Sequence, residues 1–568
     1  MQTIKSLAAS KAFRAGTRIR EDAVATVTED ARSEARAQRE AAYVEAGLWD
    51  DERLGWLAYR VAREFPDREF LCIDDLRLTY GEFTSWATAI AKDLVARGVR
   101  RGDRVLVQLP NRVEALLAQV AAFRIGAVSV PVVPIYREHE MGHIVADCRP
   151  VAVIAGEDTA TRRPCAEFDR HLAAAGLDST VRYVAGEASV PGWVPFPRRP
   201  DVPQEDAGLP EPLEPEACAL ILYTSGTTSA PKGVMLTGRA FVANNRSVGA
   251  RMAWTEDEVF FCCAPLSHLA GFVSGFAWPV SVGARVVIMP KWDGDAAADL
   301  IERERVTFTT GAAVFLHDLV RSYRKGLGAS HRITRIVSGG ATTPPVLIRA
   351  ADSLGVHAMR GYGMTETGGG ITFPGPDSDL ERRANYDGRL IDGTELEAVD
   401  PDRHPLPPGT EGELRTRGPQ SLIGYTDPAL TAAQVDEDGW FYTGDVGTVD
   451  AEGWLRITGR IKDIINRGGE KFSARDIEDA IVAHPDIDRA AVVGVPDERF
   501  GEAVGAFVTL APGVSWTGPE SVLRHLETSR LTKQKFPTEW YVLDELPATA
   551  SGKIQKHLLL EWRRQRLG

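Results

Sequence analysis

The chain has 568 residues, 44% of them hydrophobic and 26% charged, as is typical of a globular protein with more than one core. Its 66 lysines and arginines against 79 aspartates and glutamates give a net charge of −13. This balance disfavours a dedicated nucleic-acid-binding protein, which needs a basic face. No apolar run is long enough to cross a bilayer, so we expect no transmembrane helix and no stable membrane association.

The cysteines and the first fifty residues bear on the compartment. Six cysteines are present and none has metal-ligand spacing, which favours a reducing environment. Residues 1–20 carry five basic residues and no acid, a composition also found in transit peptides. The acidic, alanine-rich continuation favours instead an N-terminal helical extension over residues 1–50. We therefore expect a cytoplasmic protein.

Apolar runs alternate with amphipathic segments along much of the chain. The clearest predicted elements, in chain order, are helices at 80–95 and 114–125 and strands at 104–109, 127–133, 285–288, 306–309 and 335–338. Alternation of this kind predicts an α/β fold with parallel sheets. Residues 187–215 are rich in proline, glycine and acids and are predicted to form a surface linker.

The pattern changes after about residue 385. Residues 411–415 and 453–458 are predicted to be strands of smaller sheets. The tail contains further strands at 490–495 and 506–510 and a helix at 519–527, enough for a small α+β domain. We place the boundary near Arg460, which gives a large domain over residues 51–459 and a small one over residues 460–568.

The most informative motif is Tyr-Thr-Ser-Gly-Thr-Thr-Ser-Ala-Pro-Lys-Gly at residues 223–233, directly after an apolar run. Glycines let the backbone approach a ligand, hydroxyls and amides donate hydrogen bonds, and a lysine adds positive charge. The spacing is not that of a Walker A loop. The loop is predicted to bind phosphate through Thr224, Ser225, Gly226, Thr227, Thr228 and Lys232.

Four further motifs follow in chain order. They are Ser-Gly-Gly-Ala at 338–341, Gly-Tyr-Gly-Met-Thr-Glu-Thr at 361–367, Tyr-Thr-Gly-Asp-Val at 442–446 and Leu-Pro-Ala-Thr-Ala-Ser-Gly-Lys at 546–553. Glycines allow a flat ligand to lie against backbone. The carboxylate of Glu366 is a suitable ligand for Mg²⁺, which prefers oxygen and shares phosphates.

Taken together and in this order, the motifs resemble those of the adenylate-forming superfamily, which includes acyl-CoA synthetases. The resemblance covers roughly residues 50–560. It implies a large AMP-binding domain with parallel sheets and a β-rich subdomain, followed by a small mobile α+β domain that turns about a hinge near Lys462. A lysine at this hinge position is less common in relatives than an aspartate.

The resemblance also implies a role for each matched residue in binding nucleotide. Tyr362, flanked by Gly361 and Gly363, would stack on adenine. Thr365 would contact the α-phosphate and Glu366 would bind Mg²⁺. Asp445 would accept the ribose hydroxyls, with Arg460 beside it. The catalytic residue would be Lys553, which would offset repulsion between the substrate carboxylate and the α-phosphate.

Other matched residues concern the acyl group and CoA. Gly339, Gly340 and Ala341 would line the adenine and acyl pockets, and His268 in Pro-Leu-Ser-His would close the acyl pocket. The loop with Gly468, Gly469 and Lys471 would swing in to line the pantetheine tunnel. Candidate contacts for the nucleotide end of CoA are Lys471, Arg499 and Lys535.

The resemblance implies an AMP-forming acid–thiol ligase that uses ATP, Mg²⁺ and coenzyme A. ATP and a carboxylate give an acyl-adenylate and pyrophosphate, and the CoA thiolate then displaces AMP. Small residues at 339–341 and 368–370 predict room for a bulky cyclic or medium-length acid. The resemblance is closest to cyclohexanecarboxylate-CoA-ligase-like members and leaves secondary metabolism open.

Several alternatives stay open at this point. Ser229 stands where relatives have glycine, and Gly238 where many have histidine. An enzyme that catalyses only thioester formation, from an adenylate made elsewhere, is therefore a rival. A second rival transfers the acyl group to a carrier protein. A third is a catalytically silent nucleotide-binding relative. The sequence is also compatible with a homodimer.

Overall fold

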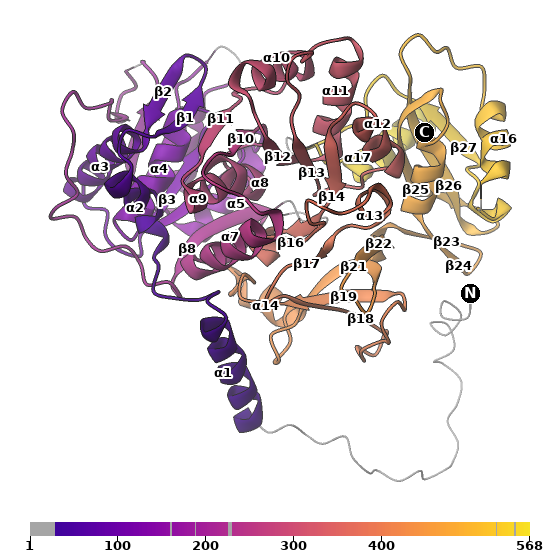
Figure 1. Cartoon of the computed structure of the whole chain (residues 1–568), viewed down its shortest axis with the longest axis horizontal. Helices are drawn as coiled ribbons and strands as arrows, with labels where there is room; N and C mark the ends of the chain where they lie inside the picture. The colour runs from indigo at the N-terminus through magenta and orange to yellow at the C-terminus, as the bar shows by residue number, and fades with distance from the viewer. Residues whose placement is uncertain are drawn as a thin grey trace.

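The computed structural model describes residues 29–159, 162–187, 189–224, 230–529, 531–549 and 552–567. It has five β-sheets, two large and three small. Figure 1 shows a large α/β body followed by a smaller C-terminal body, with helix α1 projecting from the large one. The α/β fold with parallel sheets, a large first domain and a small second domain confirms the prediction.

The first large sheet has eight strands. Their spatial order is β20 (Gly424–Tyr425), β9 (Lys232–Thr237), β8 (Cys218–Thr224), β4 (Val128–Pro131), β3 (Arg104–Gln108), β5 (Ala152–Gly156), β6 (Val181–Ala185) and β7 (Val194–Pro195). Strands β8 to β7 are parallel, whereas β9 pairs antiparallel with β8 and β20. The phosphate loop therefore connects two adjacent antiparallel strands.

The second large sheet has seven strands. Their order is β14 (His357–Arg360), β13 (Arg335–Ser338), β12 (Phe308–Gly311), β10 (Val259–Cys262), β11 (Arg285–Ile288), β1 (Glu69–Ile73) and β2 (Leu76–Thr79). All but β2 are parallel. Side chains of both large sheets share one buried cluster, which joins the two halves of the large domain.

Two smaller sheets complete the large body. One contains β15 (Tyr362–Met364), β16 (Gly369–Phe373) and β17 (Arg389–Leu390). The other contains β18 (Glu395–Val399), β19 (Gly412–Arg417), β21 (Phe441–Val449) and β22 (Leu455–Arg460). Asp445 and Arg460 lie opposite each other on β21 and β22.

The C-terminal body is built on one five-stranded sheet. Its order is β24 (Glu470–Ser473), β23 (Ile464–Arg467), β26 (Gly501–Leu510) and β25 (Ile487–Asp497), with β27 (Glu539–Val542) also on β26. Helices α15 (Ala474–Val482), α16 (Glu520–Thr528) and α17 (Lys556–Leu567) accompany it. Among the described residues, its hydrophobic clusters contain no residue before Ile465, so this body has its own core.

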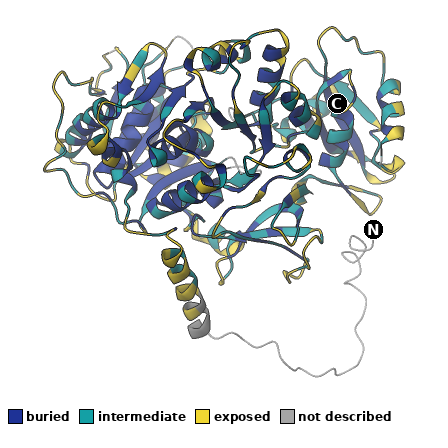
Figure 2. Ribbon diagram, viewed as in Figure 1, coloured by how far each residue is buried: buried dark blue, intermediate teal, exposed yellow. Residues whose placement is uncertain are grey.

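The remaining helices belong to the large body, where most cover the sheets with a buried side, whereas α1 projects and is largely exposed (Figure 2). They are α1 (Glu29–Glu45), α2 (Leu57–Glu64), α3 (Tyr80–Ala96), α4 (Val113–Arg124), α5 (Glu138–Cys148), α6 (Pro164–Ala174), α7 (Gly238–Met252), α8 (Leu269–Phe272), α9 (Trp278–Val282), α10 (Gly294–Glu304), α11 (Ala313–Arg324), α12 (Pro345–Asp352), α13 (Leu380–Asn385) and α14 (Pro428–Gln434). No described helix has the length and apolar character needed to cross a membrane.

Some predicted strands have different bounds: the one expected at 453–458 is β22, and the one expected at 506–510 is the end of the longer β26. Residues 306–309 were also expected to form a strand, but β12 begins at Phe308. Arg305 ends α10 with a φ of 57°, and the Val306 amide donates back to the Ile301 carbonyl. Val306 therefore completes the helix end. Thr307 already bonds through its backbone to Val259 and Arg335, the first residues of β10 and β13.

Candidate active site

A cleft of about 940 Å³ lies where the two bodies meet. Both contribute to its walls. From the predicted site it contains Gly340, Ala341, Gly361, Tyr362, Gly363, Asp445, Arg460, Lys462 and Lys553. The structure thus brings residues more than two hundred positions apart in sequence to one cavity, as the resemblance implies.

The centre of the cleft is a tyrosine–aspartate–arginine cluster. The Tyr362 hydroxyl donates to Asp445 Oδ2 at 2.8 Å, and Arg460 Nε donates to Oδ1 at 2.5 Å. Burial and the Asp445 charge raise the pKa of Tyr362 well above its ordinary value, so it stays a donor. Each carboxylate oxygen keeps a second lone pair, so Asp445 can also accept ribose hydroxyls.

Glu366 lies on the short turn after β15, beside the phosphate-loop strands. Its Oε1 accepts a hydrogen bond from the hydroxyl of Tyr425 at 3.0 Å, and Tyr425 is on β20 next to β9. Tyr425 is the only described residue that donates to this carboxylate, so the second oxygen is available for a cation. The donor set fits Mg²⁺ shared with phosphates. The neighbouring Thr365 is buried.

The phosphate loop is described at its two ends. Thr224 ends β8 and pairs with Lys232, which begins β9. Ser225, Gly226, Thr227 and Thr228 lie outside the described residues, as does Ser229. Lys232 lies close enough to Lys462 for its charge to contribute to the lowered pKa of Lys462, after burial and the charge of Arg460. The lysine at the end of the loop therefore lies near enough to the predicted hinge for its charge to act there.

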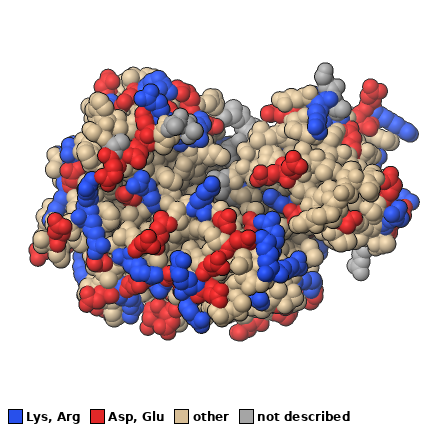
Figure 3. All heavy atoms as spheres, turned by 90° about the horizontal axis from the view of Figure 1, so that it is seen from above, with Lys and Arg blue, Asp and Glu red and all other residues tan. Residues whose placement is uncertain are grey.

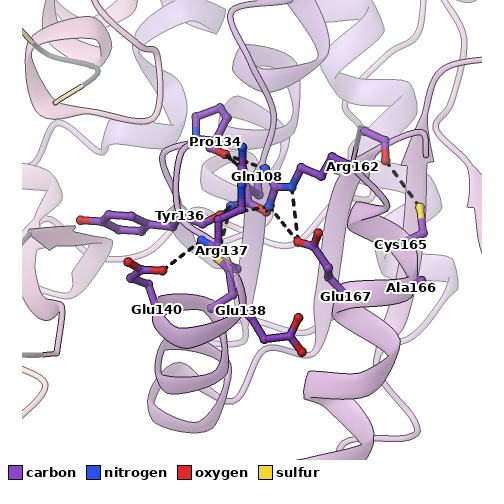
Figure 4. A network of polar contacts seen from close by, with 12 residues as sticks. Gln108, Pro134, Tyr136, Arg137, Glu138, Glu140, Arg162, Cys165, Ala166 and Glu167 are labelled. Atoms are coloured by element: carbon purple, nitrogen blue, oxygen red, sulfur yellow. Dashed lines mark hydrogen bonds and ion pairs between the residues drawn. The ribbon is translucent and has the colours of Figure 1, made fainter. Parts of the chain in front are cut away.

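Helix α5 supports both ends of the phosphate loop. The hydroxyl of Tyr223 donates to Asp147, and His143 Nε2 lies 3.1 Å from the Pro231 carbonyl oxygen. The N-terminus of α5 is fixed in turn by Arg162, which donates to the Tyr136 carbonyl at 3.0 Å and to Gln108 and Glu167 (Figure 4). Sequence reasoning missed this support because these residues form no motif.

Lys553 reaches the cleft from the small domain. Its loop is closed by a hydrogen bond from the Lys553 amide to the Thr549 hydroxyl at 3.1 Å. Gly552 has a φ of 83°, and a Cβ there would lie 2.5 Å from Val314, so the loop packs directly on the start of α11. The crowded cleft lowers the pKa of the Lys553 amine to about 8, with repulsion from Arg460 and Lys462 adding to the effect.

The cations Arg460, Lys462 and Lys553 thus line one cavity in an acidic protein, and the charge of Lys232 acts on Lys462. The face of the molecule in Figure 3 shows both charge signs interspersed, so the cluster is a local feature. Mutual repulsion of cations is relieved by a bound polyanion. The cleft therefore suits a nucleotide triphosphate.

His268 lies at the N-cap of α8, within reach of the charge of Lys553. Its Nδ1 accepts a hydrogen bond from the Ala270 amide at 3.2 Å, which leaves the ring proton on Nε2. Burial, and then the positive charge of Lys553, lowers the pKa of His268 to about 4. The ring is therefore neutral at pH 7 and can offer a hydrogen bond but no charge.

The glycines of the predicted acyl pocket behave differently from one another. Gly340 has open space around its Cβ position, with a φ of 73°, whereas a Cβ at Gly339 would lie 3.0 Å from the Gly361 carbonyl oxygen. The prediction of free volume at residues 368–370 is wrong. A Cβ there would meet Gln420, Asn244 or Phe373 at 2.3–2.6 Å. These glycines permit close packing and do not create a cavity.

The loop assigned to thioester formation lies elsewhere. Gly468 and Gly469 form the turn between β23 and β24, with φ of 62° and 89°, and they and Lys471 are exposed. They do not line the cleft. On the same outer surface Arg467 and Arg499 flank the half-exposed ring of Phe500, and Lys535 pairs with Asp476 at 2.9 Å.

Two sequence families match the chain. "AMP-binding enzyme" covers residues 58–426, and "AMP-binding enzyme C-terminal domain" covers residues 476–553. The chain belongs to the AMP-binding enzyme family. This AMP-binding enzyme is therefore an AMP-forming acid–thiol ligase that uses ATP, Mg²⁺ and CoA, as the motifs predicted.

Known relatives cover nearly the whole chain. The enzyme is 35% identical to the medium-chain fatty-acid–CoA ligase of Escherichia coli, over 92% of both chains. It is 32% identical to the indoleacetate–CoA ligase of Aromatoleum aromaticum, over 90% of this chain and 97% of that one. The structure of ATP-bound MatB from Rhodopseudomonas palustris has a TM-score of 0.79 at 28% identity, covering 91% and 100% of the two chains.

Proposed function

We propose that this enzyme adenylates a medium-length or ring-bearing carboxylic acid with ATP and transfers the acyl group to CoA. The observation that carries the proposal is the convergence of Lys553 from the small domain with the Tyr362–Asp445–Arg460 cluster of the large one. A carboxylate is a poor electrophile, and adenylation gives it AMP as a leaving group.

The residues have distinct roles in the first half-reaction. The phosphate loop and Lys232 hold the triphosphate, and Asp445 and Arg460 hold the ribose. Glu366 would hold Mg²⁺, which neutralises phosphate charge when bound. Thr365 contacts the α-phosphate. Lys553 stabilises the charge that builds up as the substrate carboxylate attacks this phosphate, while His268 closes the acyl pocket as a neutral donor.

The second half-reaction needs a different surface in the cleft. We assign the large domain to residues 51–459 and the small one to residues 460–568, and place the hinge at Lys462 in the short turn between β22 and β23. A turn about this hinge withdraws Lys553 and brings in Gly468, Gly469 and Lys471 to line the pantetheine tunnel. Their exposure in the present orientation supports this assignment.

The substrate class rests on Gly340 and on the relatives. The Cβ position of Gly340 faces open space in the wall of the cleft. The two relatives named above are ligases for medium-chain fatty acids and for indoleacetate. An acid with a chain of medium length or a ring system fits both observations.

A panel of acids tests this function, with pyrophosphate release and acyl-CoA formation measured separately. We expect both products from medium-length or cyclic acids and neither from acetate. Acyl-CoA made only from supplied adenylate would instead indicate the thioesterification-only rival. Pyrophosphate release without acyl-CoA formation would indicate that the acyl group is transferred to a carrier protein. No pyrophosphate release with any acid would indicate a silent relative.

Two expectations from the sequence belong to this proposal as well. We propose that the enzyme acts in the cytoplasm, on the basis of its buried or half-buried free cysteines. A homodimer is compatible with the catalytic scheme because each chain holds a complete cleft. Sedimentation of the purified enzyme measures its oligomeric state.

A further inference from the structure

Among the described residues, two groups of ion-paired contacts outside the catalytic residues join the small domain to the large one. In the first, which we call the α11 contact, His317 Nε2 on α11 lies 2.8 Å from Asp488 Oδ1 on β25. Both side chains are about one-quarter exposed. The contact lies on the same helix whose first turn receives the Gly552 loop, so α11 is a docking surface for the small domain.

The second group, which we call the buried cluster, consists of Arg360, Asp387 and Arg475. Arg360 of the large domain donates to Asp387 Oδ1 at 2.5 and 2.9 Å, and Arg475 of α15 donates to the same oxygen at 3.3 Å. All three residues are buried. A buried charge that loses its only partner is strongly destabilising, so such a contact is normally permanent.

In the buried cluster, Asp387 and Arg475 each keep a partner in their own domain if the two domains separate. Asp387 keeps Arg360 and the Ile457 amide. Arg475 has Asp479 one turn away on its own helix, with the nearest atoms 4.0 Å apart. These contacts therefore can be broken without leaving an isolated charge buried.

The α11 contact has the same design. His317 Nδ1 lies 3.5 Å from Asp318 on its own helix, so the imidazolium keeps a counter-ion when Asp488 leaves. Asp488 returns to water. The pairing is therefore reversible on both sides.

We propose that the α11 contact and the buried cluster are reversible docking contacts that hold the small domain in the orientation for adenylation. His317, Asp488 and Arg475 are thus positioning residues, which act by placing Lys553. This inference rests on the proposed function, because it assigns the present orientation to the first of two half-reactions. The strength of these contacts sets the balance between the two halves.

Protonation supports the proposal in a consistent direction. Hydrogen bonds to Asp318 and Asp488 raise the pKa of His317 to about 9, and Arg321 is the other charged group nearby. Asp318 stays with His317 in both orientations, so the part of this raised pKa that Asp488 supplies belongs to docking, and that stabilisation is lost as the pH rises through about 9.

Asp479 acts in the same direction. Burial raises its pKa to about 7, and the charged groups that face it are Arg360, Arg475, Asp387, Asp476 and Glu478. A raised carboxyl pKa disfavours the docked state once the pH exceeds the ordinary value and fully so above about 7. His317 and Asp479 therefore both predict that the protein binds more protons in the docked orientation than in the undocked one.

The direct test measures domain orientation without any substrate. Spin labels at Glu256→Cys and Ser515→Cys, exposed positions on the two domains, report their separation in a Cys218→Ser background, since the other cysteines are buried. Asp488→Asn removes one charge from the α11 contact. The matched control is Asp486→Asn, which removes a carboxylate charge two residues away. Asp486 forms an ion pair with His484 of the same domain.

We expect one main separation in the parent protein. Asp488→Asn should reduce the docked fraction relative to other orientations by about three- to tenfold, as should Arg475→Met, while Asp486→Asn leaves it unchanged. The docked fraction of the parent should also fall between pH 6 and pH 9. An unchanged distribution in both Asp488→Asn and Arg475→Met would overturn the proposal.

Kinetics separate positioning from a general structural effect. In Asp488→Asn, we expect pyrophosphate release to fall by about three- to tenfold. Acyl-CoA formation from isolated adenylate should stay equal to the parent or rise. Equal loss in both half-reactions would contradict the positioning role.

Variants of His317 test the other side of the α11 contact. His317→Gln removes the positive charge and should lower the adenylation rate, whereas His317→Lys keeps the charge and should retain most of that rate. If the parent protein releases no pyrophosphate with any acid, the proposed function fails, but the distance measurement still decides the docking role.

Discussion

At the scale of single residues, the account depends most on Lys553. Its amine lies in a cleft that Arg460 and Lys462 also line, and its charge contributes to the lowered pKa of His268. We expect Lys553→Ala to reduce the adenylation rate by roughly 100- to 1000-fold, because its loop brings this amine into the cleft, where a cation stabilises the charge that develops at the α-phosphate. Single-turnover pyrophosphate release measures this loss. The same variant should still convert isolated adenylate to acyl-CoA, and an equal loss there would contradict the assigned role.

The pKa of Lys553 gives a second prediction at this scale. Because the group must be protonated to stabilise negative charge, adenylation should decline as the pH rises through about 8. This value applies to kcat/KM, which reports the free enzyme. Bound ATP adds negative charge beside the amine and should move the decline in kcat to higher pH. If kcat declined at a lower pH than kcat/KM, this would contradict the claim that ATP relieves the repulsion between Lys553 and its neighbouring cations.

The motifs predicted the residues that line the cleft better than the residues that hold them in place. Tyr362, Asp445, Arg460 and Lys553 meet in one cleft, as their order in the sequence implied. Tyr425, which holds Glu366, was not predicted, since a tyrosine on a two-residue strand carries no pattern. Such partners depend on which strands become neighbours, and that is decided by tertiary packing.

At the scale of elements, glycines show how a pattern can be interpreted wrongly. Runs at 339–340 and 368–370 look alike in sequence, yet only Gly340 has open space at its Cβ position. In the other run, a Cβ at Gly369 would meet Asn244 of α7, and a Cβ at Gly370 would meet the ring of Phe373 on the same strand. Composition alone cannot separate a glycine that leaves a cavity from one that allows close packing, because both require a missing side chain.

This difference predicts two kinds of variant. Gly340→Leu should exclude ring-bearing acids and spare short linear acids that retain activity, with some loss of stability because φ is positive. Gly370→Ala should instead lower thermal stability, since its Cβ would lie 2.3 Å from the Phe373 ring. Melting temperatures and an acid panel for both variants measure this. If Gly370→Ala and not Gly340→Leu excluded ring-bearing acids, then Gly370, and not Gly340, would be the glycine that leaves room in the acyl pocket.

The elements themselves follow the sequence closely where periodicity is strong. Strands at 285–288 and 335–338 and the helices near 80–95 and 114–125 are found within a residue or two of their predicted ends. The strand at 306–309 is displaced by the left-handed residue that ends α10. A non-glycine residue with positive φ gives little signal in sequence, so this boundary could not be placed.

At the scale of the whole molecule, the cleft exists only because two separately packed bodies meet. The small domain has its own hydrophobic cores. Its catalytic loop faces the cleft, while the Gly468–Gly469 turn lies outside. These two surfaces lie apart on the small domain, which is why we propose that one site serves the two half-reactions in succession. The sequence motifs predicted both surfaces, but the contacts that hold one orientation appear only in three dimensions.

The hinge is the most direct test of this central claim. Proline at Lys462 fixes φ near −65° and removes an amide donor, so Lys462→Pro should hold the domains in one orientation. Lys462→Ala removes the same side chain and keeps the backbone free. The decisive measurement compares single-turnover pyrophosphate release with acyl-CoA yield from isolated adenylate in these two variants. We predict that Lys462→Pro retains adenylation within about tenfold and loses acyl-CoA formation by roughly 100-fold or more, while Lys462→Ala retains both. Equal retention of both halves in Lys462→Pro would contradict alternation about this residue.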